Sequence, residues 1–383
     1  MEFDRRTVTA MLAGAGLIAP GAALADPRMF RASITIDNNR VLIAVGMNGA
    51  GPYIFMIDTG QYVSMIRPDL AKQLRLPVQG YEGTRGIGGK GGRFALYLAR
   101  DFVIGGGIRQ SQVVLQDSFD FGYDQGIYGA LAAGIVTATD TDLDFDAGEL
   151  RLYPDGRGDR PGFVAVDSEI PRVERVGRGS QKIMATILLD GRPISCELDT
   201  GSPNTLSLSQ SVARRLGLWG DRPFAPNRPN GIGGTGPIAR IVRVGSMELG
   251  GIRAERPVIT LLGNDLSGSM DGVVGLSFLR RFNMSIDVKG RKLWVQPSKQ
   301  SPVPDRYRLS GLWLDREGSR IVVNTVGAGS PAAKEGLKPG DRIIGEWDAV
   351  LRALDGPPGS VVRLTVERNG AAREVALTLT SYL

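Results

Sequence analysis

Two segments of this 383-residue chain share one pattern, and that pattern decides the predicted fold. Tyr53–Gly60 reads YIFMIDTG and Ile194–Gly201 reads ISCELDTG, so in both a mostly apolar run leads into Asp-Thr-Gly. A short apolar run bounded by glycine predicts a buried β-strand. Asp58 and Asp199 are 141 residues apart in the sequence. Repetition at that spacing predicts two structurally equivalent halves.

The residues downstream of each Asp-Thr-Gly also repeat. The tetrapeptide Gly-Ile-Gly-Gly occurs twice, at Gly86, Ile87, Gly88 and Gly89 and again at Gly231, Ile232, Gly233 and Gly234. Further on, apolar-apolar-glycine segments end at Gly129 and Gly275. Because the motifs recur in the same order, we predict a first lobe over 30–153, an interlobe linker at 154–172 and a second lobe over 173–297.

The Gly-Ile-Gly-Gly segments have a second interpretation. Both extend to the Gly-x-Gly-x-x-Gly pattern of dinucleotide-binding loops, which requires a helix to open at the glycines. The residues that follow, at 94–98 and 238–244, are instead rich in apolar and β-branched types. These runs predict strands, so we interpret the glycines as the tips of β-hairpins.

The composition narrows the chemistry that the chain can perform. Apolar residues make up 42% of the sequence, and 53 glycines predict many turns, which favours a mainly β fold. Histidine is absent, which excludes Ser-His-Asp and Cys-His catalysis and every histidine-ligated metal site. The single cysteine, Cys196, excludes an intrachain disulfide and is interpreted as a buried structural thiol. We therefore expect no metal and no cofactor.

The net charge bears on the protein's partners, and the N-terminal residues bear on its cellular location. The net charge is +6, but the basic residues form no block, so we expect no nucleic-acid partner. Arg5 and Arg6 precede an apolar stretch at 10–19 and small residues at 23–25, which predicts a signal peptide over 1–25. The arginine pair resembles a twin-arginine signal, and a Sec signal is the alternative. The apolar run is too short to span a bilayer, so we expect a periplasmic or secreted protein without stable membrane insertion.

The two Asp-Thr-Gly motifs suggest a reaction. A carboxyl group at the end of an apolar strand needs partners or a shared proton, because a lone buried charge is costly. Asp58 and Asp199, in matched lobes, would meet across a pseudo-twofold axis and share one proton. One carboxyl group could then take a proton from water while the other donates to an amide carbonyl oxygen. Glycine after each Asp-Thr would permit the close approach, and the two threonines could hydrogen-bond across the axis.

These motifs together resemble the aspartic proteases. The hairpins are similar to those of retropepsins, whereas two lobes on one chain are similar to pepsin. The resemblance implies two β lobes with a substrate cleft between them, flap hairpins at 86–89 and 231–234, and glycines 129 and 275 beneath the Asp loops. It also implies a catalytic pair and its supporting residues, namely Asp58 and Asp199 with Thr59, Gly60, Gln61, Thr200, Gly201 and Ser202. Because one chain supplies both Asp residues, a monomer would suffice for catalysis.

One position departs from the family pattern. These proteases usually carry Ser, Thr or Ala after the glycine, which Ser202 fits and Gln61 does not. The Ser202 hydroxyl could form a hydrogen bond with the outer oxygen of the Asp199 carboxyl group. The Gln61 amide could donate an equivalent bond to the Asp58 carboxyl group, but from a longer and less rigid side chain. The departure leaves open how well Asp58 is oriented.

The last part of the chain predicts a separate module. A linker rich in Pro, Ser and Lys at 298–306 precedes residues 307–383, in which Gly329–Ile344 resembles the signature of a bacterial PDZ domain. Ser330 would cap a helical turn with proline next to it, and a second helix is expected at 349–354, with closing strands at 361–367 and 374–379. The resemblance implies that an extended peptide adds to this sheet, its C-terminal carboxylate held by a loop near Leu309, Ser310, Gly311 and Leu312. A purely structural appendage is the alternative.

The sequence thus supports one main hypothesis for function and two rivals. The main hypothesis is an exported bacterial aspartic endopeptidase that acts on polypeptides and uses its PDZ domain to recruit substrates or partners, with C-terminal peptides as possible ligands. The first rival is a peptide-binding protein that keeps the cleft but has lost efficient catalysis. The second is a scaffold in which only the PDZ domain carries the function.

Overall fold

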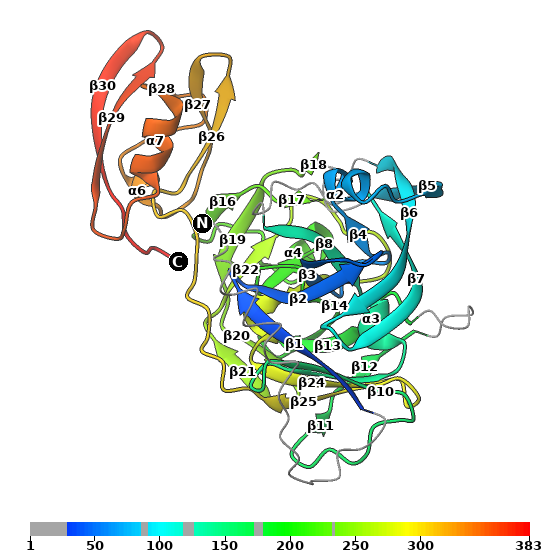
Figure 1. Cartoon of the computed structure of the whole chain (residues 1–383). Coiled ribbons are helices and arrows are strands. Elements are labelled where there is room, and N and C mark those ends of the chain that lie inside the picture. Colours follow the sequence, from blue (N-terminus) through cyan, green and yellow to red (C-terminus); the bar gives the residue numbers. More distant parts are fainter. Residues whose placement is uncertain (1–28, 86–90, 118–125, 172–178, 232–233) are drawn as a thin grey trace.

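The structure is a computed structural model that describes residues 29–85, 91–117, 126–171, 179–231 and 234–383 (Figure 1). The predicted signal peptide lies outside these ranges. Within them, no helix is long and apolar enough to cross a membrane. The chain is mainly β, as predicted, and its strands form two matched lobes followed by a smaller C-terminal module (Figure 1).

In the described residues, the first lobe comprises ten strands and two short helices. Its central element is β3, which ends at Asp58 and pairs in parallel with β8. The elements are β1 Phe30–Asp37, β2 Arg40–Met47, β3 Ala50–Asp58, β4 Met65–Ile66, α2 Pro68–Gln73, β5 Val78–Arg85, β6 Gly91–Ile104, β7 Ile108–Gln116, β8 Ile127–Ala132, α3 Gly134–Thr137, β9 Asp140–Asp144 and β10 Glu149–Tyr153.

The second lobe repeats this plan. Its β14 ends at Asp199 and pairs in parallel with β23, just as β3 pairs with β8. The elements from the interlobe segment onward are β11 Val164–Ala165, β12 Ser168–Glu169, β13 Met184–Leu189, β14 Arg192–Asp199, β15 Leu206–Leu208, α4 Gln210–Arg215, β16 Ala225–Asn227, β17 Asn230–Gly231, β18 Gly234–Thr235, β19 Ala239–Arg243, β20 Ser246–Leu249, β21 Ile252–Glu255, β22 Val258–Leu261, β23 Gly272–Gly275, α5 Leu276–Leu279, β24 Phe282–Asp287 and β25 Lys292–Pro297.

The strand register corrects one predicted equivalence. Gly275 lies beside Asp199 and packs under its loop, as expected, because a Cβ there would lie 2.7 Å from the Ser202 carbonyl oxygen. Gly129 instead pairs with Phe55, three residues before Asp58, whose own strand partner is Ala132. Gly129 therefore corresponds in register to Gly272. The predicted equivalence of Gly129 and Gly275 was wrong, because the apolar-apolar-glycine pattern is too general to locate the residue beside the Asp. Hydrogen-bond register is set by tertiary pairing.

The two lobes are joined through one sheet. β24 and β25 fall within the predicted second lobe, yet β24 pairs with β9 of the first lobe. In this pairing Met284 lies opposite Leu143, and these two residues are separated by the same 141-residue offset as the two Asp residues. The pseudo-twofold axis therefore passes between them. A single cluster of buried apolar side chains extends through both lobes, so they form one continuous core.

The interlobe segment packs against this shared sheet. β11 pairs with β25 and β12 pairs with β13, which makes part of the predicted linker a component of the fold. The Arg157 guanidinium donates to Ser285 Oγ at 2.6 Å and stacks on Trp294. Arg160 forms an ion pair with Asp142. The segment that the sequence predicts as a connector therefore also ties the two lobes together.

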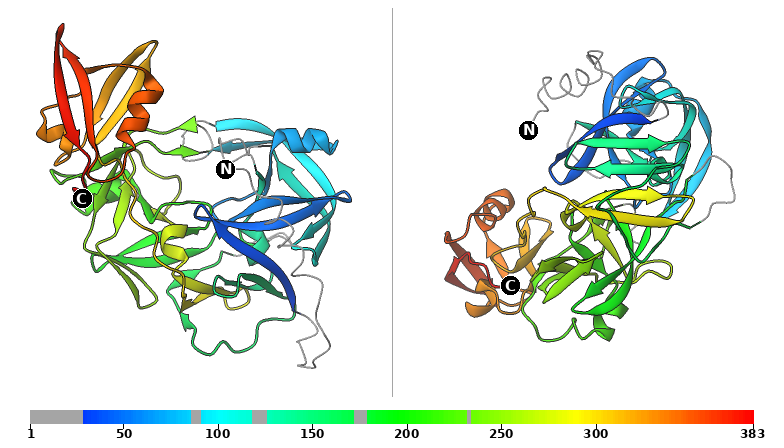
Figure 2. Two further views of the ribbon diagram at one scale, coloured as in Figure 1. Left: turned by 60° about the vertical axis from the view of Figure 1, so that its left-hand side comes forward. Right: turned by 90° about the horizontal axis from the view of Figure 1, so that it is seen from below.

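The C-terminal module is a five-stranded sheet with two helices and its own apolar core. It lies beside the second lobe and away from the first (Figure 2). Ser330 caps the first helix, since its Oγ accepts from Ala333 N at 3.2 Å, and Pro331 follows it as predicted. The elements are β26 Leu312–Glu317, β27 Arg320–Val326, α6 Pro331–Lys334, β28 Arg342–Ile344, α7 Trp347–Leu354, β29 Val361–Arg368 and β30 Ala371–Thr378.

Candidate active site

Asp58 and Asp199 meet where the two lobes join. Each is the last residue of its central strand, and each carboxyl group lies against the glycine of the opposite Asp-Thr-Gly. The Asp58 side chain is 4% exposed, and Asp199 is partly exposed. The structure thus brings together the two carboxyl groups that the sequence singled out, 141 residues apart.

Thr59 and Thr200 hold the two Asp loops in register. Both side chains are buried, and each Oγ1 accepts from the backbone N–H of the other threonine, at 3.2 Å from Thr59 and 3.0 Å from Thr200. Each hydroxyl also donates across the junction at 2.6 Å, to the carbonyl oxygen of Leu198 or of Ile57. These four bonds satisfy buried donors and acceptors of both loops at once, so neither loop can shift alone.

The glycines after the threonines make room for the opposite carboxyl group. A Cβ at Gly60 would lie 2.6 Å from Asp199 Oδ2, and one at Gly201 would lie 2.5 Å from Asp58 Oδ2. Heavy atoms without a hydrogen bond do not approach this closely, so any larger side chain would push the carboxyl groups apart. The predicted reason for glycine at these positions is therefore confirmed.

The two carboxyl groups differ in their backbone donors. Asp58 Oδ1 accepts from Gly60 N at 3.1 Å, whereas Asp199 Oδ1 accepts from both Gly201 N at 2.8 Å and Ser202 N at 3.1 Å. Burial raises both pKa values, and the Asp199 charge raises the pKa of Asp58 well above its ordinary range. Backbone N–H donors stabilise the ionised carboxylate and so oppose the rise in pKa. Asp199 accepts from two of them and Asp58 from one, so the opposition is stronger at Asp199. When the pair shares one proton, these donors favour the charge on Asp199 and the proton on Asp58.

Gln61 and Ser202 differ in what they contribute. Ser202 N donates to the Asp199 carboxyl group, whereas Gln61 N donates at 3.2 Å only to the main-chain oxygen of Asp58. No hydrogen bond links the Gln61 amide to the Asp58 carboxyl group. The Gln61 carbonyl oxygen accepts from Ala133 N, which anchors the loop to the residue after β8. Gln61 therefore supports Asp58 through the backbone.

The predicted flap residues are only partly described. Gly86–Gly89, Ile232 and Gly233 lie outside the described residues. The strands that lead to the first segment, β5 and β6, pair antiparallel up to Arg85 and Gly91, and Gly231 pairs with Gly234 between β17 and β18. The described parts therefore form antiparallel hairpin stems at both predicted positions.

One residue beside the carboxyl pair was not singled out from the sequence. Glu197 lies two residues before Asp199 on β14, is 4% exposed, and its Oε1 has no hydrogen-bond partner in the described part of the chain. Burial, with the nearby Asp199 charge, raises its pKa to about 8. The sequence signal that could have found Glu197 is a glutamate in the mostly apolar run that precedes Asp-Thr-Gly. Its neighbour Cys196 is buried with a raised thiol pKa, consistent with the predicted structural role.

The predicted carboxylate loop of the C-terminal module is already hydrogen-bonded within itself. Gly311 N donates to Arg308 O at 3.0 Å, and Leu312 N donates to Ser310 Oγ at 3.3 Å. Ser310 is 1% exposed, and Leu309 packs against the apolar core of the module. A peptide carboxylate would have to replace these internal bonds to use the loop.

The module contacts the second lobe just before the β17–β18 hairpin. Phe224 N donates to Ala328 O at 3.2 Å, and Tyr382 Oη donates to Phe224 O at 3.3 Å. Arg228 donates to Gly236 O at the base of the hairpin and forms an ion pair with Asp315 on β26. The module is therefore attached to the same segment that carries the second predicted flap.

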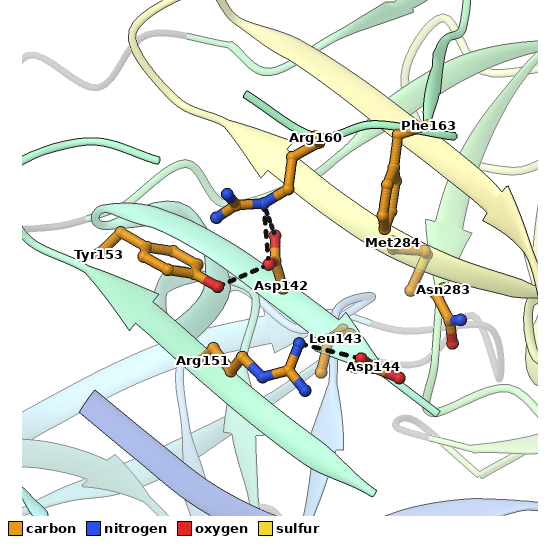
Figure 3. Close-up of a pocket in the computed structure, with 9 residues that line it drawn as sticks. All are labelled: Asp142, Leu143, Asp144, Arg151, Tyr153, Arg160, Phe163, Asn283 and Met284. Carbon is orange, nitrogen blue, oxygen red and sulfur yellow. Dashed lines mark hydrogen bonds and ion pairs between the residues drawn. The ribbon is translucent and has the colours of Figure 1, made fainter. Parts of the chain in front are cut away.

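A pocket of about 190 Å³ lies elsewhere, over the shared sheet (Figure 3). It is lined from both lobes and the interlobe segment. Arg160 pairs there with Asp142, which also accepts from Tyr153 Oη at 2.8 Å, and Arg151 pairs with Asp144 (Figure 3). No residue of the carboxyl pair or of its supporting loops lines it.

Comparison with known proteins gives a partial match. Residues 183–278 match the model of a family described as aspartyl protease, and this stretch contains the second Asp-Thr-Gly. No curated protein matches the chain. Among solved structures, an aspartic proteinase from Irpex lacteus aligns with a TM-score of 0.46 at 16% identity, covering 71% of this chain and 98% of that one. Basic 7S globulin from soybean aligns with a TM-score of 0.41 at 11% identity, covering 70% and 95%.

Proposed function

We propose that this chain is an aspartic endopeptidase that hydrolyses peptide bonds in polypeptides through Asp58 and Asp199. The observation that carries the proposal is the placement of the two carboxyl groups, each against the glycine of the opposite Asp-Thr-Gly, with the two loops held by the reciprocal threonine bonds. The match of residues 183–278 to the aspartyl protease model supports it from the sequence side.

The unequal protonation of the pair assigns the two roles. Asp199, ionised and partly exposed, takes a proton from a water molecule, whose oxygen then attacks the amide carbonyl carbon. Asp58 gives its proton to the carbonyl oxygen, so a neutral tetrahedral intermediate forms. Asp199 then gives the proton it took from water to the leaving nitrogen, while Asp58 takes a proton from a hydroxyl group of the intermediate. The C–N bond breaks to release an amine and a carboxylic acid, and the pair again holds one proton. The reaction uses no group beyond the two carboxyl groups and water.

The remaining predictions extend this proposal. The protein is exported by the segment 1–25 to the periplasm or beyond, and it acts as a monomer because both carboxyl groups come from one chain. The module at 307–383 is a PDZ domain that recruits polypeptide substrates or C-terminal peptides. Its attachment at Phe224 and Arg228 supports a role in substrate presentation, because the contact adjoins the β17–β18 hairpin.

Cleavage of an unfolded protein mixture by the purified protein, from acidic to neutral pH, tests the proposed activity. Asp58→Asn and Asp199→Asn should each reduce cleavage by several orders of magnitude while the circular dichroism spectrum stays unchanged. Asp221→Asn, at an exposed position of the second lobe, is the matched control and should cleave like the wild type. Peptide binding without cleavage at any pH would overturn the proposal and favour a peptide-binding protein.

The module is tested separately with two variants at its contact with the second lobe. Tyr382→Phe removes the donor to Phe224 O, and Arg228→Ala removes the ion pair with Asp315. If the module presents substrates, the double variant should cleave a short peptide at the wild-type rate but an unfolded protein more slowly. An equal loss of cleavage rate on both substrates would indicate that the contact stabilises the second lobe and does not present substrates.

A further inference from the structure

A third carboxyl group lies beside the pair and has no place in the proposed reaction. Side chains two apart on a strand point to the same face, so Glu197 and Asp199 share one face of β14. Glu197 is 4% exposed, and its Oε1 has no hydrogen-bond partner among the residues that the structure describes. A buried carboxyl oxygen without a partner costs stability, which calls for an explanation.

The fold itself does not require a glutamate there. In the first lobe the corresponding position, two residues before Asp58, is Met56, which is 1% exposed. An apolar side chain therefore fits the same place in the same strand arrangement. The glutamate is specific to the second half of the pseudo-symmetric site.

The residues paired with Glu197 on the neighbouring strands are apolar and half-buried. Its strand partners are Met184 on β13 and Val273 on β23, and both are half-buried, unlike the fully buried residues on the core face of these strands. From the first lobe, Tyr62 contributes an aromatic ring that is 51% exposed, and burial together with the Glu197 charge raises its pKa. An acceptor with apolar and aromatic neighbours suits a side chain with an aliphatic stem and a cationic end.

We propose that Glu197 is a specificity-determining residue that binds the lysine or arginine side chain of a polypeptide substrate next to the bond to be cleaved. The inference rests on the proposed peptidase function and names its substrate class. The aliphatic stem lies against Met184 and Val273, and the cationic group donates to Glu197.

Burial and two charged groups set the pH dependence of Glu197. Burial and the Asp199 charge, on the same strand, disfavour the ionised carboxylate, and Lys182 before β13 favours it. From the first lobe, Tyr62 lies within electrostatic range of Glu197. Among the described residues no side chain, Lys182 included, forms a hydrogen bond with Glu197 Oε1, which leaves this oxygen for the substrate's cation. Because the pKa of Glu197 is about 8 and a cation favours the ionised form, the preference for lysine should rise with pH up to about 8.

The test uses pairs of fluorogenic peptides that differ only in lysine or norleucine, with that residue moved through the positions on both sides of the scissile bond. Norleucine keeps the aliphatic stem and lacks the charge. At one position the wild type should prefer lysine roughly tenfold or more in kcat/KM, the range expected for a charge-assisted hydrogen bond. In Glu197→Gln and Glu197→Met this ratio should fall to about one. Glu248→Gln, at a half-buried position on β20, is the control that should keep the wild-type ratio.

The ratio separates this role from a structural one, since a packing defect would slow both peptides of a pair equally. A wild-type ratio of about one at every position, or a ratio that survives in Glu197→Met, would overturn the inference. If the wild type cleaves no peptide, the proposed peptidase function fails and fluorescence anisotropy of the same peptides decides the inference. Tighter binding of the lysine peptide that is lost in Glu197→Met would support it, and equal binding or none would overturn it.

Discussion

Thr59 and Thr200 bind each other's backbone across the junction of the two lobes, with each hydroxyl oxygen accepting from the other residue's N–H. Each hydroxyl also donates to the carbonyl oxygen of the residue before the opposite Asp. The position of one carboxyl group is thereby tied to that of the other. The site is therefore a property of the two lobes together.

The first prediction concerns this threonine pair. Thr59→Val keeps the side-chain shape but leaves the Thr200 N–H and the Leu198 carbonyl oxygen buried without a partner. We expect a loss of about 2–4 kcal/mol in the free energy of unfolding, measured by urea denaturation. Thr200→Val removes the other two of the four bonds, and the double variant should lose less than the sum of the single losses, because all four bonds belong to one network across the same junction.

Thr186→Val is the control for this experiment, because its hydroxyl donates to Asp167 at an exposed position. It should cost less than about 1 kcal/mol. A Thr59→Val variant as stable as Thr186→Val would show that the reciprocal bonds do not hold the lobes together.

The second prediction concerns the glycine next to the carboxyl pair. In Gly201→Ala the new Cβ would lie 2.5 Å from Asp58 Oδ2, so the carboxyl groups must separate. We expect kcat/KM to fall by at least about a hundredfold, because a displacement of about 1 Å is enough for such a loss. In Gly220→Ala nothing lies within 4 Å of the new methyl group, and activity should be kept. Wild-type activity in Gly201→Ala would contradict the observed approach of the two loops.

The third prediction concerns the pH dependence of cleavage. Activity requires Asp199 ionised and Asp58 protonated. Because the pKa of Asp58 is raised well above its ordinary value, kcat/KM should fall on the alkaline side as Asp58 loses its proton, and on the acidic side as Asp199 gains one. A bell-shaped profile of kcat/KM against pH checks this. A rate that keeps rising with pH above the neutral range would exclude a protonated carboxyl group as the acid.

The fourth prediction concerns stability at neutral pH. The pKa of Glu197 in the folded protein is about 8 against an ordinary 4.5, so the folded state binds more protons than the unfolded state between these values. A carboxyl group with a raised pKa therefore weakens the fold as pH rises, by up to roughly 1.4 kcal/mol per pH unit in this window. Glu197→Gln should remove this loss, so its stability relative to the wild type should increase from pH 5 to pH 8.

Urea denaturation of both proteins at several pH values measures the difference. Glu248→Gln provides the comparison, since it replaces a carboxyl group that is only half-buried. Parallel stability curves for the wild type and Glu197→Gln would show that Glu197 is already ionised in the folded protein.

The sequence by itself determined the repeated architecture and the main candidate residues. Apolar runs ending in Asp-Thr-Gly specify buried strands that stop at Asp58 and Asp199, because strand propensity and glycine-bounded ends are local properties. The Ser330 cap and the following proline likewise specified a helix start in the C-terminal module. Such features depend on residues a few positions apart, which a single sequence displays.

Only the tertiary structure decided how these parts meet. Strand pairing placed Ala132, and not Gly129, beside Asp58, and it joined β24 of the second half to β9 of the first. The unequal backbone donors of the two carboxyl groups, and the burial of Glu197 beside Asp199, also became visible only there. The physical reason is that hydrogen-bond register and burial arise between segments far apart in the sequence, and no local pattern encodes which of them come into contact.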